Sequence, residues 1–281
     1  MTSPVLEARA ALEAAGRLPD AEIDIASVAL QFARVDQPAA DWHTAQAHLS
    51  ELARAAVELA GSDPQADAGD LLRRRGALAE LVHGVFGYAG DPETYDDLSN
   101  ANLLRVIERR RGLPVALGIL WLHAAEAAGW QAHGIDFPGH FLIALAGRGQ
   151  VVVDVFGGGD ALEAKDLRAL LKTFAGESAE IGPDTLAPMG KRAVLLRLQN
   201  NIKLRRLRDG DLPGAVACAE DMLRLAPDVA PLWREAGLMH QRLGHVTAAI
   251  LSLERFLELS PDGPQSNRVR GLLEELRHRL N

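Results

Sequence analysis

Apolar residues follow the helical repeat most clearly between Pro114 and Gly129, in the middle of the chain. They cover most sides of the expected helix, as in a helix that is buried all round. Pro114 suits the first turn, where a missing N–H has no partner to lose, and Gly129 suits a left-handed stop. The pattern predicts that this helix is the buried centre of a domain.

After this helix the pattern changes to two short apolar runs, 141–145 and 151–156, around a glycine-containing turn. Such a pattern is typical of a β-hairpin. Gly147 lies seven residues from both His140 and Asp154, so a turn symmetric about Gly147 predicts that these two side chains are opposite each other. Directly opposed Cβ atoms are roughly 4.5 to 5.5 Å apart, and a register slip of one residue would separate the pair.

Amphipathic patterns predict further helices before and after this centre. The expected ranges are 23–34, 41–60, 70–85, a helix from near Ala101 that Asn100 caps, and 163–173. The arginines at 109–111 end the helix that precedes Pro114, where their charges suit the negative end of the helix dipole. A second interpretation is that they hold an anionic group near His140.

The last third of the chain repeats with a period of 34 residues, which is typical of tetratricopeptide repeats. The period relates small residues and prolines at equivalent positions: Gly210 and Gly244, Ala215 and Ala249, Pro227 and Pro261. The expected units are two repeats and a capping helix, at 196–229, 230–263 and 264–281.

Stacked repeats present a concave groove, through which we expect a protein or peptide partner to bind. The candidate partner-binding residues in the first repeat helix are Asn200, Asn201, Arg205 and Arg206. Such side chains can bind a partner's carboxylates. The alternative is a solvated helix face that only keeps the helix soluble.

Composition narrows the class of protein. With 281 residues and 48% apolar content, the chain suffices for one or two packed domains, and its net charge of -8 argues against unspecific binding to nucleic acid or anionic membranes. No run approaches the roughly 18 apolar residues of a membrane helix, and the first twenty residues lack the apolar core of a signal peptide. A single cysteine, Cys218, agrees with a reducing compartment, so we expect a cytoplasmic protein.

His140 and Asp154 are the candidate catalytic residues, because a carboxylate beside an imidazole fixes its tautomer and raises its basicity. Between Asn100 and Lys172, however, the sequence contains no Ser, Thr, Cys or Tyr that could act as nucleophile. The alternative role is a hydrogen-bonded pair that stiffens the hairpin. The sequence has no HExxH, Walker or dinucleotide motif, so no metal and no cofactor is expected.

The order of a helix, a strand with His and a strand with Asp resembles the transglutaminase-like, papain-related core. That core carries its cysteine at the helix N-terminus, where this chain has Leu113 and Pro114. The segments ERRRGLPVALGILWLHAAEAAGW, FPGHFLIAL and VVVDVFGGG more closely resemble the bacterial SirB-type family. That family joins a transglutaminase-like domain to tetratricopeptide repeats.

The resemblance implies an α+β fold, with a mainly helical transglutaminase-like domain and small antiparallel sheet at 1–181, a linker at 182–190 and all-α repeats at 191–281. It also implies a site at His140 and Asp154, flanked by Asn100, Glu108, Gly112, Pro114 and Gly139. The chain departs from the family pattern at Ala101, where a serine is common, which weakens any proposal of a hydroxyl nucleophile there.

Two functions from different classes follow. The first is a non-catalytic transglutaminase-like protein that acts as a protein-interaction or regulatory scaffold. The second is a hydrolase or acyl-transfer enzyme in which His140, oriented by Asp154, activates water or a group of the substrate without a thiol nucleophile. The oligomeric state is left open by the sequence.

Overall fold

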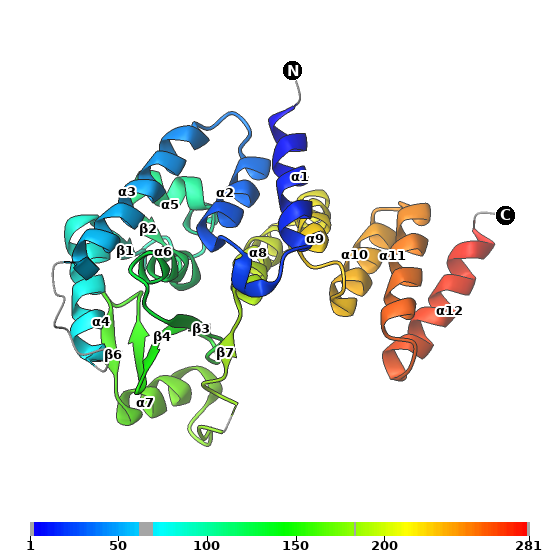
Figure 1. Cartoon of the computed structure of the whole chain (residues 1–281). Helices are drawn as coiled ribbons and strands as arrows, with labels where there is room; N and C mark the ends of the chain where they lie inside the picture. The colour runs from blue at the N-terminus through cyan, green and yellow to red at the C-terminus, as the bar shows by residue number, and fades with distance from the viewer. Residues whose placement is uncertain (1–2, 62–69, 183, 280–281) are drawn as a thin grey trace. The chain divides into compact units, whose positions relative to one another are not determined.

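A computed structural model describes residues 3–61, 70–182 and 184–279 of the chain (Figure 1). The chain separates into two compact units. The first contains the residues up to Ala8 and Pro19–Leu198, and the second contains Arg9–Leu18 and Gln199–Asn281. The predicted domain limits and the linker at 182–190 stay a prediction. The first unit extends to Leu198, which lies inside the first repeat helix at 191–208.

The helices of the first unit confirm the predicted amphipathic segments within a few residues. They are η1 (Asp20–Glu22), α2 (Ile25–Asp36), α3 (Trp42–Gly61), α4 (Leu71–Ala79), the π-helical turn η2 (Glu80–Val85), η3 (Leu98–Asn100), α5 (Leu103–Arg109), α6 (Pro114–Ala127) and α7 (Ala164–Ala175). The helix α1 (Pro4–Gly16) precedes them. The predicted cap of α5 was wrong, because Asn102, and not Asn100, accepts a hydrogen bond from the Arg105 amide.

Helix α6 is the buried centre of the first unit, as predicted. It lies between helices α2 and α3 on one side and the sheet on the other (Figure 1). Pro114 occupies its first turn and Gly129 follows its end with φ +71°. Trp121 and Leu117 are fully buried, and Gly118 leaves room for the ring of Phe141, which packs directly on the helix backbone.

The sheet has five antiparallel strands in the order β6-β5-β4-β3-β7. The strands are β3 (Ala132–Ile135), β4 (Leu142–Gly147), β5 (Gly149–Asp154), β6 (Asp160–Leu162) and β7 (Pro188–Met189), and a separate parallel pair joins β1 (Ala89–Gly90) to β2 (Arg111–Gly112). Strand β7 lies inside the segment 182–190 that the sequence pattern assigned to a linker.

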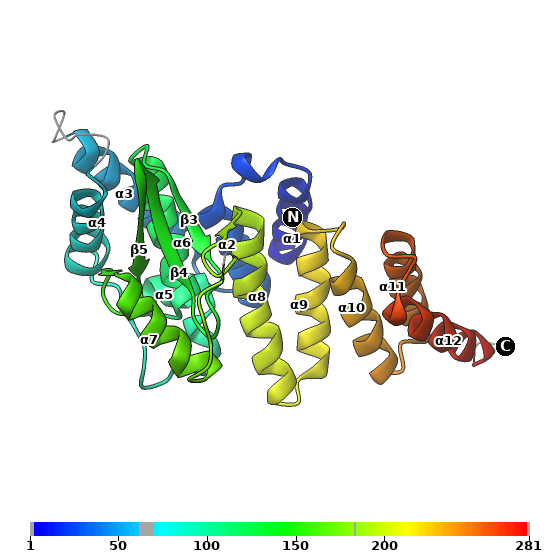
Figure 2. The ribbon, with the colours of Figure 1, turned by 90° about the horizontal axis from the view of Figure 1, so that it is seen from below.

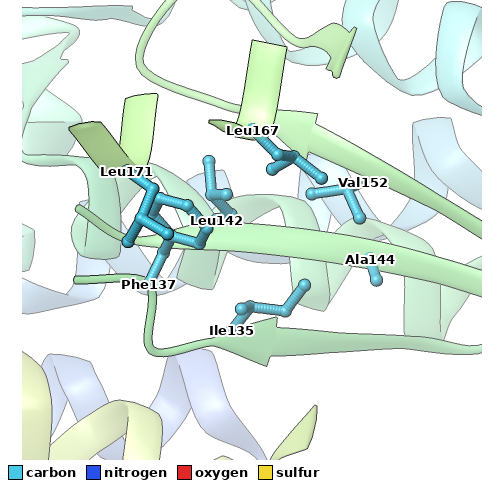
Figure 3. Packing of buried hydrophobic residues seen from close by; sticks show 7 residues of the cluster. All are labelled: Ile135, Phe137, Leu142, Ala144, Val152, Leu167 and Leu171. Atoms are coloured by element: carbon cyan, nitrogen blue, oxygen red, sulfur yellow. The ribbon is translucent and has the colours of Figure 1, made fainter. Parts of the chain in front are cut away.

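Both faces of the sheet are covered, which explains why its strands read as nearly continuous apolar runs. Leu142, Ala144 and Val152 pack with Leu167 and Leu171 of α7 in one cluster (Figure 3). The alternate strand residues are also buried. The turned view in Figure 2 shows α7 beside strands β4 and β5.

The predicted hairpin exists, but its predicted register was wrong. The turn is centred on Arg148, since Gly147 pairs with Gly149 and Ile143 pairs with Val153. His140 therefore precedes the strand and has no partner in the ladder. The sequence pattern could not place the centre, because Gly147 and Gly149 are equally good turn residues.

A partly buried polar cluster holds the segment that leads into α6. Arg110 has φ +56°, the only positive value at a non-glycine residue in the described chain. Its guanidinium donates to the Tyr88 hydroxyl at 2.6 Å, and that hydroxyl contacts Nε2 of His48 at 2.8 Å. Burial first, and the charge of Arg110 second, lower the pKa of His48 to about 4. These contacts hold a backbone conformation that would otherwise be strained.

The second unit consists of α-helices that follow the 34-residue period. After α8 (Lys191–Arg208) come α9 (Leu212–Leu225), α10 (Ala230–Arg242), α11 (Val246–Leu259) and α12 (Pro264–His278). Figure 2 shows α9 and α10 side by side. Cys218 is buried and donates to the Gln199 carbonyl at 3.4 Å, as expected of a packing residue. The predicted end of the capping helix at 280–281 lies outside the described residues.

We predict that Gly118→Ala destabilises the first unit. A Cβ atom there would lie 2.3 Å from a ring carbon of Phe141, so overpacking of about 1 to 3 kcal/mol outweighs the better helix propensity of alanine. Gly76→Ala in α4 is the matched control, because nothing lies within 4 Å of its Cβ position and alanine adds up to about 1 kcal/mol. Urea unfolding measures both, and equal stabilities would contradict the packing.

We also predict that acidification weakens the first unit through His48. Between pH 7 and pH 5, His48 becomes protonated in the unfolded chain. In the folded chain it stays neutral, because the pKa of His48 there is about 4. The loss at pH 5 is at most about 2 kcal/mol and is smaller where water screens the ring. Urea unfolding at both pH values should show a smaller pH effect in His48→Gln, and an unchanged pH effect would contradict this assignment.

Candidate functional site

His140 is placed by a tight turn in front of β4. Its amide donates to the Phe137 carbonyl at 2.9 Å, and Gly139 within the turn has φ +71°. A Cβ atom at residue 139 would lie 2.5 Å from the ring of Phe174, so both the turn and the packing require glycine. This turn directs the His140 side chain to Asp154, although the two residues are not paired in the β4–β5 ladder as predicted.

The predicted contact between His140 and Asp154 is present. Nε2 of His140 lies 3.1 Å from Oδ1 of Asp154, which also accepts the amides of Phe156 at 3.0 Å and Gly157 at 3.3 Å. Burial by itself would raise the pKa of Asp154, but the hydrogen bond and charge of His140, together with the two amides, lower it below the ordinary value. Asp154 is therefore an anion that fixes the imidazole with Nε2 as the donor.

Aromatic rings cover the imidazole on two sides. Phe174 stacks on His140 with ring centres 6.0 Å apart, and Phe156 meets it edge-on at 6.4 Å. The imidazole keeps only 9% of its surface exposed, whereas Phe174 is 51% exposed and so stands between His140 and solvent. Sequence analysis missed both phenylalanines, although Phe156 lies only two residues after Asp154.

The N-terminus of α6 is apolar and closed. Leu113 and Pro114 are both buried, and the Leu113 amide donates to the Asn100 carbonyl at 2.8 Å. Gly112 pairs with Gly90 across the short parallel ladder, and the ring of Phe156 packs on Gly90. Through Phe156, the segment before α6 is connected to His140.

Asn100 is buried in a polar cluster beside this segment. Its side-chain amide donates to the Thr94 carbonyl at 2.6 Å, and its oxygen accepts from Arg109 at 2.9 Å. Arg109 also bonds Asp91 at 2.8 Å. Hydrogen bonds from the Thr94 hydroxyl and amide, followed by Arg109 and Asn100, lower the pKa of Asp91 to about 2. Arg109 thus already binds Asp91, and the interpretation that the arginines at 109–111 hold an anionic group near His140 stays a prediction.

The structure shows no contact between Glu108 and His140 or Asp154, so the grouping of Glu108 with the site stays a prediction. Its carboxylate is half exposed on α5 and pairs with Arg105 at 2.7 Å, three residues earlier in the same helix. An exposed pair at this spacing contributes a few tenths of a kcal/mol to the helix. The other predicted flanking residues form two groups. Gly112 and Pro114 lie beside Asn100, whereas Gly139 directly precedes His140. Phe156 connects the two groups, because its ring contacts both Gly90 and His140.

The predicted partner-binding arginines already bind acceptors within the second unit. Arg205 is buried and donates to the carbonyl and side chain of Asn201, at 3.2 and 3.0 Å. Arg206 donates to the Gly214 carbonyl at 2.9 Å. Asn200 is half-buried. Since Arg205 and Arg206 already hold acceptors of this chain, a partner's carboxylates would have to compete for them.

The described residues contain no group of three or more His, Cys, Asp or Glu side chains placed to bind a metal ion. Among the helices of this described part, none combines the length and the apolar character that crossing a membrane requires.

Two family models match the chain in the order that the fold suggests. A transglutaminase-like superfamily model covers residues 43–200, and a tetratricopeptide repeat model covers 202–274. Fold and site thus define a transglutaminase-like domain followed by tetratricopeptide repeats. The chain belongs to the bacterial UPF0162 family, which includes proteins named SirB1.

Relatives within this family match most of the chain. A UPF0162 protein of Xylella fastidiosa is 31% identical over 267 residues, which is 92% of this chain and 91% of the relative. A UPF0162 protein of Vibrio cholerae is 29% identical, with 72% and 75% covered, and SirB1 of Salmonella typhimurium is 24% identical, with 72% and 76% covered. The solved structure of menin is 12% identical, with a TM-score of 0.44 over 91% of this chain and 70% of menin, a similarity too low to bear on function.

We predict that Asp154→Ala lowers the free energy of unfolding by about 2 to 3 kcal/mol, because it leaves His140 and two amides without their acceptor. Asp160→Ala is the control, since Asp160 is exposed on neighbouring β6, and it should cost less than about 0.5 kcal/mol. Urea unfolding at pH 7 compares the two variants. Equal losses would show that the Asp154 contacts do not stabilise the fold.

Proposed function

We propose that this protein is a non-catalytic transglutaminase-like scaffold that acts by binding other proteins. The observation that carries the proposal is the pair Leu113 and Pro114 at the start of α6, where the transglutaminase-like core places its cysteine. Both side chains are buried, so neither a thiol nor an open position exists at that point. The one cysteine of the chain, Cys218, belongs to the second unit.

The state of His140 supports the same proposal. A general base must reach the group that it deprotonates, but this imidazole is almost wholly buried between Phe156 and Phe174. Its Nε2 hydrogen is directed to Asp154. The pair therefore works as a structural link between the turn before β4 and the end of β5.

The repeats supply the positive part of the proposal. Tetratricopeptide repeats generally mediate contacts between proteins, and the second unit is built from them. A regulatory role would follow if a partner's activity depended on this contact. The cytoplasmic location and the absence of nucleic-acid partners remain predictions from composition and charge.

A second candidate function is kept because the His140–Asp154 geometry is itself suitable for proton transfer. In that case the protein would be a hydrolase or acyl-transfer enzyme in which His140 activates water. This function requires Phe174 to move from the imidazole face, because its ring stacks on the imidazole and only 9% of the imidazole surface is exposed.

The test is cross-linking of the full chain to its neighbours in living cells, followed by mass spectrometry. We expect the wild-type chain, His140→Ala and Asp154→Asn to capture the same set of proteins, provided each variant remains folded by circular dichroism. Loss of the captured set in the folded His140→Ala variant would contradict the proposal. So would the absence of any protein captured above a control without cross-linker.

A further inference from the structure

Aromatic side chains from three separate segments of the first unit contact one another through His140. The ring of Tyr95 meets Phe156 edge-on with centres 5.7 Å apart, and Phe156 and Phe174 both contact the imidazole. Tyr95 lies in the loop before η3, Phe156 directly follows Val155 at the end of β5, and Phe174 lies in the last turn of α7. We call Tyr95, Phe156 and Phe174 the aromatic strip.

The aromatic strip is open to solvent at both ends. Tyr95 is 40% exposed and Phe174 is 51% exposed, whereas Phe156 between them is half-buried. Part of the Phe174 ring covers Gly139 and His140, and the rest faces water. Adjoining exposed apolar groups mark binding surfaces more often than single ones, and aromatic side chains are enriched at the centres of protein interfaces. The strip is therefore a candidate contact surface.

The loop that carries Tyr95 is acidic. Residues 89–104 contain no Lys, Arg or His, but they include Asp91, Glu93, Asp96 and Asp97. The last three of these carboxylates are exposed. Hydrogen bonds from the hydroxyl and the amide of Ser99 lower the pKa of Asp97, so this group is charged at neutral pH. We call residues 91–97 the acidic loop.

Basic side chains beside the aromatic strip are matched by acidic ones. The ion pairs are Arg109 with Asp91, Arg197 with Asp136, and Lys172 with Glu177. Arg75, which donates to the Gly159 carbonyl at 3.3 Å, adds one positive charge, and Asp160 directly after Gly159 adds one negative charge. The exposed carboxylates of the acidic loop therefore leave a negative excess at the Tyr95 end of the strip.

We infer that the aromatic strip and the acidic loop bind a peptide segment of a partner protein in which apolar side chains are flanked by Lys or Arg. The apolar side chains pack on the exposed rings of Phe174 and Phe156. The cations pair with Glu93 and its acidic neighbours and lie against the ring of Tyr95. Acidic segments are repelled by the same carboxylates. This surface goes beyond the proposed function, which assigns partner binding to the repeats of the second unit.

The experiment titrates the full chain into three fluorescein-labelled peptides and measures fluorescence polarisation. The probes are GKRLFRKG, which is basic and apolar, GEDLFDEG, which is acidic and apolar, and GKRSSRKG, which is basic and polar. We expect GKRLFRKG to bind at least about tenfold more tightly than the other two. Equal binding of GKRSSRKG would show that only charge is recognised and would overturn the inference. Equal binding of GEDLFDEG, or no binding of GKRLFRKG, would also overturn it.

Substitutions in the two parts of the surface should each weaken the binding of GKRLFRKG about tenfold or more. Tyr95→Ser and Phe174→Ser remove exposed rings, and Glu93→Lys reverses an exposed charge. Circular dichroism checks that each variant is folded. Because Phe174 covers His140, Tyr95→Ser provides a second test of the rings that leaves this cover in place.

Matched controls are Val57→Ser and Glu58→Lys, at exposed residues of α3. Helix α3 lies on the opposite side of α6 from the sheet (Figure 1), so we expect both controls to bind GKRLFRKG like the wild type. Unchanged binding in Tyr95→Ser and Glu93→Lys would overturn the inference, and so would equal losses in the controls. The cross-linking experiment decides separately on the scaffold function.

Discussion

The burial of α6 on every side is the constraint on which the first unit depends. A helix without a polar face must be covered completely, and here α2, α3 and the sheet share that task. Gly118 lets Phe141 reach the helix backbone, so the strand that carries Phe141 is held at a fixed distance. The turn that presents His140 directly precedes this strand, and the position of the imidazole follows from helix packing.

On the proposed non-catalytic function, the same packing explains how the transglutaminase-like framework persists. In the transglutaminase-like core the helix N-terminus lowers the pKa of a thiol, but Leu113 and Pro114 turn that end of α6 into part of the apolar core. His140 and Asp154 keep their hydrogen bond because it joins the turn before β4 to the end of β5. Their contact then has a structural reason that does not require a substrate.

The sequence predicted the helices, the hairpin, the repeats and the contact between His140 and Asp154, because each depends on local periodicity or on a family pattern. It misplaced the hairpin centre, since Gly147 and Gly149 compete for one turn and only packing on α6 and α7 decides between them. The roles of Phe156 and Phe174 depend on contacts between separate elements. No spacing rule shows such contacts, and none showed that Arg205 is buried.

The central claim is that the transglutaminase-like unit retains its framework but not its chemistry. The most direct measurement is turnover of a panel of glutamine amides and nitrophenyl esters by the purified full chain, compared with His140→Ala. The account predicts no turnover above buffer and no difference between the two proteins. Turnover by the wild-type chain that disappears in the folded His140→Ala variant would contradict it.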